Sequence, residues 1–197
     1  MTARTVHPIE AQSYRILRST VDTSHLAPYS RDVVERIVHT TADPGWVTDL
    51  VTDEAALAAG AAALRDGAPL VADVAMVAAG ITRYPSVCLL GESAGRGMTR
   101  SAAGIRAAAQ TAADGAVWAI GNAPTALVEL LRLAADGAVR PALVIGLPVG
   151  FVGAVEAKAA LRGTGLPQLT NVSARGGAAV AAAAVNALLY GDPLEGR

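Results

Sequence analysis

Apolar residues recur at helical spacing through the first third of the chain. Between Ile9 and Val21 they fall on one side of a helix, with Arg15 and Arg18 on the other side. The same spacing predicts a second helix over 31–42. A third helix is expected after Asp53, a residue type that caps helix N-termini, and alanine-rich sequence continues it to 66–67.

From residue 68 onward, short apolar runs replace this spacing and alternate with longer helical stretches. The runs predict strands over 69–73, 86–90, 116–120, 141–145 and 168–172. Helices are predicted over 98–113, 124–135, 152–162 and 177–190, after every run except the first. This alternation predicts a three-layer α/β/α sandwich with a mostly parallel five-stranded sheet and a helical N-terminal third. We expect one domain over residues 1–197.

Glycine-rich elbows follow three of the predicted strands and open the next helices, at 91–93, 121–125 and 146–150. In open parallel sheets, ligands bind beyond the carboxyl ends of the strands, where glycine lets the backbone approach them. Asn122 and Thr125 could donate to a ligand from the second elbow, or could simply cap the following helix. Tight turns of this kind are also needed by α/β proteins that bind nothing there.

Composition narrows the classes of function. Of 197 residues, 52% are hydrophobic and 17% charged, and the formal net charge is −1. A chain with this charge has no overall positive potential to attract nucleic acid or a membrane surface. An anionic ligand must therefore be bound by individual arginines. The longest helical apolar stretch, 178–190, is shorter than the roughly 20 residues of a membrane span. With no signal peptide evident at the N-terminus, we expect a cytoplasmic protein.

Motifs for common cofactors are missing from the sequence. Neither G-x-G-x-x-G after the first strand nor a P-loop occurs, and the three histidines are too scattered for a zinc site. The one cysteine, Cys88, lies in an apolar run and is interpreted as a buried small residue. We therefore expect no metal and no cofactor, and a site built from one histidine, arginines and backbone elbows.

The stretch from Glu35 to Trp46 is the best candidate for proton chemistry. His39 is expected in the last turn of its helix, because Pro44 disfavours helical geometry at Asp43. The helix C-terminus favours imidazolium, whereas Arg36, one turn earlier on the same face, disfavours it. Asp43, about one turn ahead, could orient the imidazole, although aspartate before proline is also a common turn residue. The alternative is a helix-end histidine among ordinary surface charges.

Seven blocks of sequence resemble, in the same order, those of the precorrin-8X methylmutase family of cobalamin biosynthesis. They are Ile9–Arg18, Arg36–Asp43, Asp73–Ile81, Thr99–Ala103, Ala119–Leu127, Gly146–Ala154 with Glu156 and Lys158, and Gly176-Gly177 leading to Asn186–Leu188. Because the blocks span nearly the whole chain, the resemblance is more specific than any single motif.

The resemblance implies a reaction, a fold and roles for particular residues. The reaction is migration of a methyl group from C-11 to C-12 of precorrin-8X or its cobalt form, without a redox cofactor or an external methyl donor. His39 matches the family's proton donor, and Arg36 and Ser13 match substrate-contacting positions. The family's α/β/α sandwich is a homodimer with the site near the subunit interface, so a homodimer is expected here.

Arginine suits the carboxylate-rich periphery of such a substrate, because it binds carboxylates with two charge-assisted hydrogen bonds. Arg100 is the best further candidate because it opens a helix beyond a strand end, and Arg83 and Arg175 are others. Bound carboxylates would offset Arg36 and raise the pKa of His39. The residues His39-Thr40-Thr41-Ala42-Asp43 favour the cobalt-dependent branch of the family only weakly.

Two other functions stay open at this stage. A corrinoid-binding or carrier protein without catalysis would also use the arginines, but it would not need His39. An unrelated α/β enzyme acting on a small anionic metabolite would have a pocket too small for a macrocycle.

Overall fold

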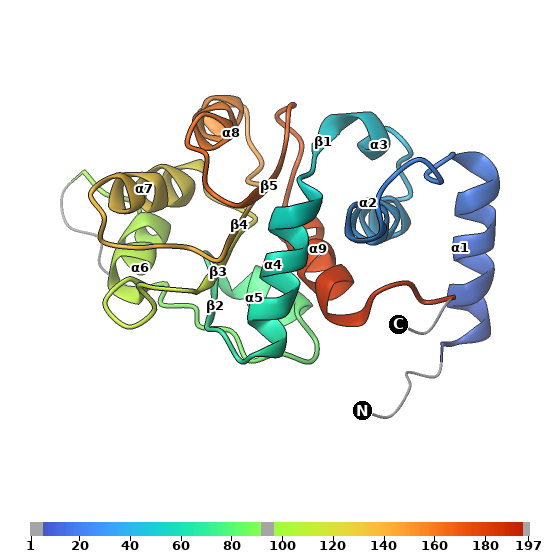
Figure 1. Ribbon diagram of the computed structural model, residues 1–197. Helices are drawn as coiled ribbons and strands as arrows, with labels where there is room; N and C mark the ends of the chain where they lie inside the picture. Colours follow the sequence, from blue (N-terminus) through green and yellow to red (C-terminus); the bar gives the residue numbers. More distant parts are fainter. Residues whose placement is uncertain (1–5, 92–96, 195–197) are drawn as a thin grey trace.

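The computed structural model describes residues 6–91 and 97–194 (Figure 1). The helices are α1 (Pro8–Thr20), α2 (Pro28–Thr41), α3 (Trp46–Asp49), α4 (Glu54–Arg65), α5 (Ala75–Gly80), α6 (Arg100–Ala108), α7 (Pro124–Ala135), α8 (Ala154–Arg162) and α9 (Ala178–Tyr190). The strands are β1 (Leu50–Val51), β2 (Leu70–Ala72), β3 (Val117–Ile120), β4 (Leu143–Gly146) and β5 (Gln168–Asn171).

These strands form one five-stranded sheet in the order β1-β5-β4-β3-β2. The pairs β2–β3, β3–β4 and β4–β5 are parallel, so the predicted α/β class and mostly parallel sheet are confirmed. The fifth strand is not the predicted one. β1 pairs antiparallel with β5, with Leu50 opposite Asn171. A strand of two residues is too short to show a hydrophobic pattern in the sequence.

The predicted strand over 86–90 is wrong. Only Val87 of this run pairs with the sheet, in a single parallel bridge to Val71. Val87 donates to the carbonyl of Leu70 and accepts from Ala72, and the pairing ends there. Cys88, expected to be buried, is half-buried and free, because this segment lies along the outer edge of β2.

Helices cover both faces of the sheet (Figure 1). On one side α4, α5 and α9 pack on the strands, with α2 against α9 and α1 outermost against α2. On the other side α6, α7 and α8 cover a second, separate cluster of buried apolar residues. The three-layer sandwich and the helical N-terminal third are confirmed, and α1 and α2 add an outer layer on one face only.

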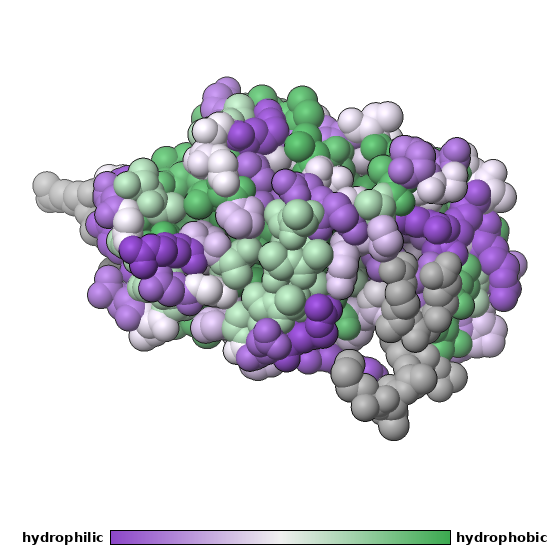
Figure 2. Space-filling model, viewed as in Figure 1, coloured by the Kyte–Doolittle hydropathy of each residue, from purple (hydrophilic) through white to green (hydrophobic). Residues whose placement is uncertain are grey.

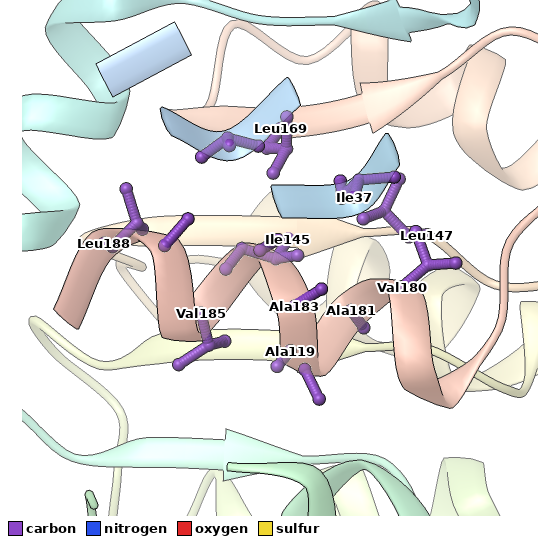
Figure 3. Packing of buried hydrophobic residues seen from close by; sticks show 14 of the residues in the cluster. Ile37, Ala119, Ile145, Leu147, Leu169, Val180, Ala181, Ala183, Val185 and Leu188 are labelled. Atoms are coloured by element: carbon purple, nitrogen blue, oxygen red, sulfur yellow. The ribbon is translucent and has the colours of Figure 1, made fainter. Parts of the chain in front are cut away.

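α9 is buried on nearly all sides because it lies between the sheet and α2. Nine of its thirteen residues are buried, and six of these nine are alanine. Figure 3 shows Ala119 and Ile145 of the sheet beside α9, together with Ile37 of α2. Small side chains let the layers approach closely, since a Cβ added at Gly80 of α5 would lie 2.6 Å from Cβ of Ala182. An all-apolar helix is expected at such a buried position.

The ends of two helices follow the predicted local rules. α2 ends at Thr41, and Ala42 then takes the left-handed conformation with φ of 53°. α4 begins after Asp53, whose carboxylate accepts a hydrogen bond from the backbone of Ala56 at 3.0 Å.

The visible surface mixes hydrophilic and hydrophobic residues (Figure 2). Pale green in the middle of this face coincides with the alanine-rich helix α4. Among the described residues, no helix is long and apolar enough to cross a membrane.

Candidate active site

The centre of the site is His39, in the last turn of α2. Its Nδ1 lies 2.8 Å from Oγ of Ser13, which projects from α1. The Tyr14 ring, next along α1, stacks on the imidazole with 4.8 Å between ring centroids and 26° between planes. The imidazole is therefore positioned by two consecutive residues of a helix that is separate in sequence. Ser13 and His39, both singled out above, are brought together.

Arg36 lies one turn before His39 and is almost completely buried, with an exposed fraction of 8%. Its Nη1 is 3.8 Å from the carboxylate of Glu10. Its Nε and Nη2 are buried, and no described residue accepts a hydrogen bond from them. The rings of Tyr14 and Tyr190 lie on it instead, each with its centroid 5.9 Å from the guanidinium carbon. Arg36 is thus a desolvated cation held by aromatic rings and a single carboxylate.

This environment lowers the pKa of His39 below its usual value of 6.5. Burial is the main cause, the charge of Arg36 adds to it, and Glu10 opposes both. The predicted effect of Arg36 on the ligand-free protein is confirmed. The larger effect, desolvation of the imidazole by burial, was not predicted, because local spacing does not reveal how α1 packs on α2.

A pocket of about 210 Å³ opens beside the imidazole. It is lined by α1, by the end of α2 and by the turn that follows: Ser13, Ile16, Leu17, Thr20, Val21, Val38, His39, Ala42 and Pro44. Ligand pockets commonly measure about 300–1,000 Å³, so this surface encloses only one edge of a large ligand.

A buried ion cluster, not predicted from the sequence, fixes α1 against α2. Glu35 of α2 is 1% exposed, and its carboxylate accepts two hydrogen bonds from Nε of Arg18 at 3.0 and 3.1 Å. Thr23 and Arg31 donate to the same carboxylate at 2.5 and 3.0 Å. Arg18 also contacts Asp192, beyond α9, at 2.6 Å. The only signal in the sequence was a glutamate on an apolar helix face.

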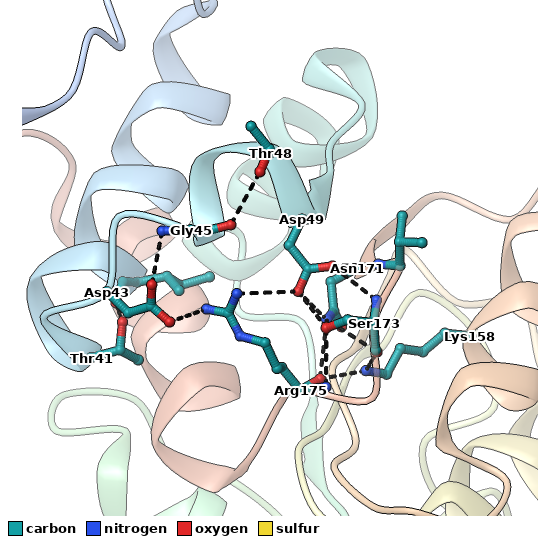
Figure 4. A network of polar contacts seen from close by, with 11 residues as sticks. Thr41, Asp43, Gly45, Thr48, Asp49, Lys158, Asn171, Ser173 and Arg175 are labelled. Carbon is teal, nitrogen blue, oxygen red and sulfur yellow. Dashed lines mark hydrogen bonds and ion pairs between the residues drawn. The ribbon is translucent and has the colours of Figure 1, made fainter.

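Asp43 forms no hydrogen bond or ion pair with His39 in the part of the chain that the structure describes. Its Oδ1 accepts from the backbone of Gly45 at 2.8 Å, and its other oxygen pairs with Arg175 (Figure 4). The guanidinium of Arg175 lies over the Trp46 ring, 4.3 Å from its centroid. The hydrogen-bond partner of Nδ1 is Ser13 instead, so Asp43 acts in this structure as a turn residue that anchors the segment after α2.

Hydrogen bonds from Lys158 and to Asp49 fix the loop that carries Arg175. Lys158 of α8 is completely buried and donates to the carbonyls of Ser173 and Arg175. Burial lowers the pKa of Lys158 to about 8. Asp49 accepts from Oγ of Ser173 at 2.6 Å and from Nδ2 of Asn171 at 2.9 Å (Figure 4). Lys158, Asn171 and Arg175 therefore join α8 and the end of β5 to the wall of the His39 pocket.

The elbow after β3 is occupied by a carboxylate of the chain itself. Asp73, which is 2% exposed, accepts from the backbone N–H groups of Gly121, Asn122 and Ala123 at 3.0, 2.9 and 2.8 Å. Burial raises the pKa of Asp73, and these three bonds oppose the rise. The backbone donors that we expected to meet a ligand are therefore used internally. Asp73 was missed, although its place directly after a strand was a signal.

The other predicted binding residues lie apart from His39. Arg100 and Thr125 belong to α6 and α7, on the opposite face of the sheet from α1 and α2 (Figure 1). Thr125 does not cap α7; its hydroxyl lies 2.7 Å from that of Thr99. Asn122 is exposed on its elbow. In the described part of the chain, no hydrogen bond or ion pair joins these three side chains to the His39 cluster, and their roles stay predictions.

Residues 92–93 of the first predicted elbow lie outside the described residues. Within 6–91 and 97–194, no group of three His, Cys, Asp or Glu side chains is placed to hold a metal ion.

Comparison with known proteins gives consistent matches over most of the chain. A family model described as precorrin-8X methylmutase matches residues 8–191. Cobalt-precorrin-8 methylmutase of Methanothermobacter thermautotrophicus is 40% identical, over 93% of this chain and 92% of the relative. Precorrin-8X methylmutase of a Sinorhizobium species is 39% identical, over 91% of this chain and 92% of the relative. A solved structure of precorrin-8X methylmutase from Thermus thermophilus superposes with a TM-score of 0.84 at 33% identity, covering 92% of this chain and 93% of that one.

Proposed function

Because the chain belongs to the precorrin-8X methylmutase family, we propose that its His39 site moves a methyl group from C-11 to C-12 of precorrin-8X or cobalt-precorrin-8. The protein is an isomerase of cobalamin biosynthesis. The observation that carries the site assignment is the imidazole of His39, held by Ser13 and placed beside the desolvated charge of Arg36.

In the proposed mechanism, the imidazolium of His39 gives a proton to the macrocycle. The added positive charge promotes migration, in which the methyl bond to C-11 breaks and a bond to C-12 forms. Isomerisation leaves the composition unchanged, so the macrocycle must afterwards lose one proton, and His39 is placed to take it back. The Ser13 hydroxyl can accept from the imidazolium and donate to the neutral ring, so it can follow both protonation states.

Arg36 would link substrate binding to the acidity of His39. In the free protein Arg36 lowers the pKa of His39. A substrate carboxylate bound at Arg36, whose side chain is 10% exposed, would offset that charge and raise the pKa of His39. His39 would then carry its proton mainly when substrate is present.

We further propose that the enzyme works as a homodimer. The pocket of about 210 Å³ holds only one edge of a macrocycle, so a second surface is needed to enclose it. On α1, beside the pocket, Ile9 and Ile16 are 70% and 58% exposed, and apolar side chains so exposed are suited to a subunit contact. Light scattering on the purified protein tests this; a monomer at micromolar concentration would contradict it.

The function is tested by mixing the protein with precorrin-8X and with cobalt-precorrin-8 and recording the visible spectrum of the product. Wild type is expected to convert at least one of them, and His39→Ala to bind without conversion. His25→Ala is the matched control, because His25 is exposed on the surface.

The other outcomes of this assay identify the alternatives. Binding by wild type without conversion would indicate a carrier protein. No binding of either macrocycle would indicate an enzyme for a smaller anion. Full activity of His39→Ala would remove His39 from the mechanism.

A further inference from the structure

Five side chains form a continuous stack that begins at His39 and ends at an exposed arginine. Tyr14 lies on His39 with 4.8 Å between ring centroids. The guanidinium carbon of Arg36 lies 5.9 Å from the centroids of both Tyr14 and Tyr190. Arg83 then lies over Tyr190, again at 5.9 Å. Cations and aromatic rings at these separations attract each other.

The outer end of the stack has a fixed position. The hydroxyls of Tyr190 and Thr82 lie 2.7 Å apart, which joins the end of α9 to the segment that carries Arg83. One turn earlier on α9, Nδ2 of Asn186 donates to the carbonyl of Gly80 at 2.8 Å. The backbone that presents Arg83 is therefore tied to α9 at two consecutive turns.

Arg83 differs in its partners from five other arginines that the structure describes. Arg18, Arg31, Arg106, Arg132 and Arg175 each form an ion pair with a carboxylate at 3.1 Å or less. Arg83 is exposed, and among the residues that the structure describes it pairs with no carboxylate. Its charge is held in place by an aromatic ring and remains available to an anion.

A hollow of about 220 Å³ lies next to this stack, between α2, α5 and α9. It is lined by Thr40, Gly80, Ala179, Ala182, Ala183 and Asn186. Thr40 is one turn after Arg36, and Asn186 is one turn before Tyr190. Oδ1 of Asn186 is buried here without a hydrogen-bond donor among the described residues. The region beside the stack therefore contains a hollow next to a buried amide oxygen that has no donor among the described residues.

From these observations we propose that Arg83 binds a second peripheral carboxylate of the macrocycle, at the far end of the stack from His39. This inference rests on the proposed function. One substrate carboxylate would meet Arg36 near the reacting edge, and another would meet Arg83. Tyr190 sets the spacing between the two cations. Arg36 and Arg83 together would therefore select ligands whose carboxylates have the matching positions around the macrocycle. Arg83 is a binding residue that determines specificity, and it takes no part in proton transfer.

The test compares Arg83→Gln with Arg140→Gln, a control arginine whose side chain is 78% exposed and 3.6 Å from Asp114. Affinity for the corrinoid product is measured by the change in its visible spectrum on binding, and KM and kcat are measured with precorrin-8X. We expect Arg83→Gln to raise the Kd about tenfold, the loss of one charge-assisted hydrogen bond. Arg83→Gln should raise KM more than it lowers kcat. Arg140→Gln should have the same Kd, KM and kcat as wild type.

A second ligand separates charge recognition from simple packing. For a corrinoid whose peripheral carboxylates have been converted to amides, Arg83→Gln and wild type should bind equally. Arg83→Lys, which keeps the charge but not the planar contact with Tyr190, should recover part of the affinity for the acid.

The outcomes distinguish the two proposals. If wild type converts precorrin-8X while Arg83→Gln and Arg140→Gln have the same Kd, the Arg83 assignment is overturned and the enzymatic function stands. An equal loss of affinity for the acid and for the amide would also overturn it. If wild type neither binds nor converts a corrinoid, the proposed function itself fails.

Discussion

Oγ of Ser13 lies 2.8 Å from Nδ1 of His39, although 26 residues separate them in the chain. The resemblance to the methylmutases placed Ser13 among substrate contacts, whereas here its hydroxyl is directed at the imidazole. Because Nδ1 is engaged in this way, Nε2 is the nitrogen left to exchange a proton with a ligand. The relationship makes Ser13 a positioning residue for the proposed acid.

We predict that Ser13→Ala lowers kcat about tenfold, because the imidazole loses one hydrogen bond that holds its orientation. The measurement is the rate of product formation under saturating precorrin-8X. Ser19→Ala is the control, since Ser19 is exposed on the same helix and its hydroxyl donates to the carbonyl of Ile16. A rise in KM alone would assign Ser13 to the substrate instead.

Replacement of Arg36 should change the acidity of His39. In the free protein, Arg36→Gln is expected to raise the pKa of His39, because a neighbouring positive charge is removed. Glu10→Gln should lower it, since Glu10 favours the imidazolium. Titration of the imidazole by NMR checks both directions, with Arg15→Gln on the exposed side of α1 as control.

The same titration tests the link to substrate. Bound corrinoid product should raise the pKa of His39 in wild type, and should do so less in Arg36→Gln. A pKa of His39 that stays constant or falls when the product binds to wild type would contradict the proposed role of Arg36.

Asp43 and Arg175 should act as a pair that shapes the pocket wall. We predict that Asp43→Asn and Arg175→Gln each raise KM about threefold, consistent with about 0.2–1 kcal/mol for an exposed ion pair. Together they should cost little more than either alone, because each single change already breaks the pair. Steady-state kinetics on the two single variants and the double variant provide the test.

An orienting role for Asp43 would give a different result. In that case Asp43→Asn would lower kcat and shift the pKa of His39, while Arg175→Gln would leave both unchanged. The contacts of Asp43 with Gly45 and Arg175 favour the first outcome.

Removal of the Glu35 charge should destabilise the fold. Its burial raises its pKa, but hydrogen bonds from Arg18, Thr23 and Arg31 outweigh this and keep the pKa below 4.5. We predict that Glu35→Gln lowers the free energy of unfolding by about 3 kcal/mol at pH 7, because Arg18 and Arg31 lose a buried partner. Urea unfolding provides the measurement, and Glu156→Gln on the exposed side of α8 is the control.

The pH dependence has a definite sign. Because the pKa of Glu35 is lower in the folded protein, its stabilising contribution is present above about pH 4.5 and is lost as the pH falls through the folded value. The difference between wild type and Glu35→Gln should therefore shrink in acid. A difference that is constant from pH 7 to pH 3 would show that the cluster does not act through this charge.

Local spacing in the sequence determined much of the framework. The alternation of apolar runs and helices predicts the parallel strands, because a buried strand and the helix that covers it are each formed by one contiguous segment with its own hydrophobic pattern. The end of α2 near Pro44, and the placement of Arg36 one turn before His39, follow from backbone geometry alone. The order of the seven sequence blocks identified the family.

Contacts between distant segments were decided only by the tertiary structure. Asp43 meets Arg175 across 132 residues, and Arg18 meets Asp192 across 174. Two-residue β1 joins the sheet because α3 delivers it beside β5, whereas 86–90, despite its apolar pattern, pairs only at Val87. The stack from His39 to Arg83 draws on α1, α2, α9 and the segment after α5. Such pairings depend on how helices pack across the core, and packing brings together residues whose separation in the chain carries no periodic signal.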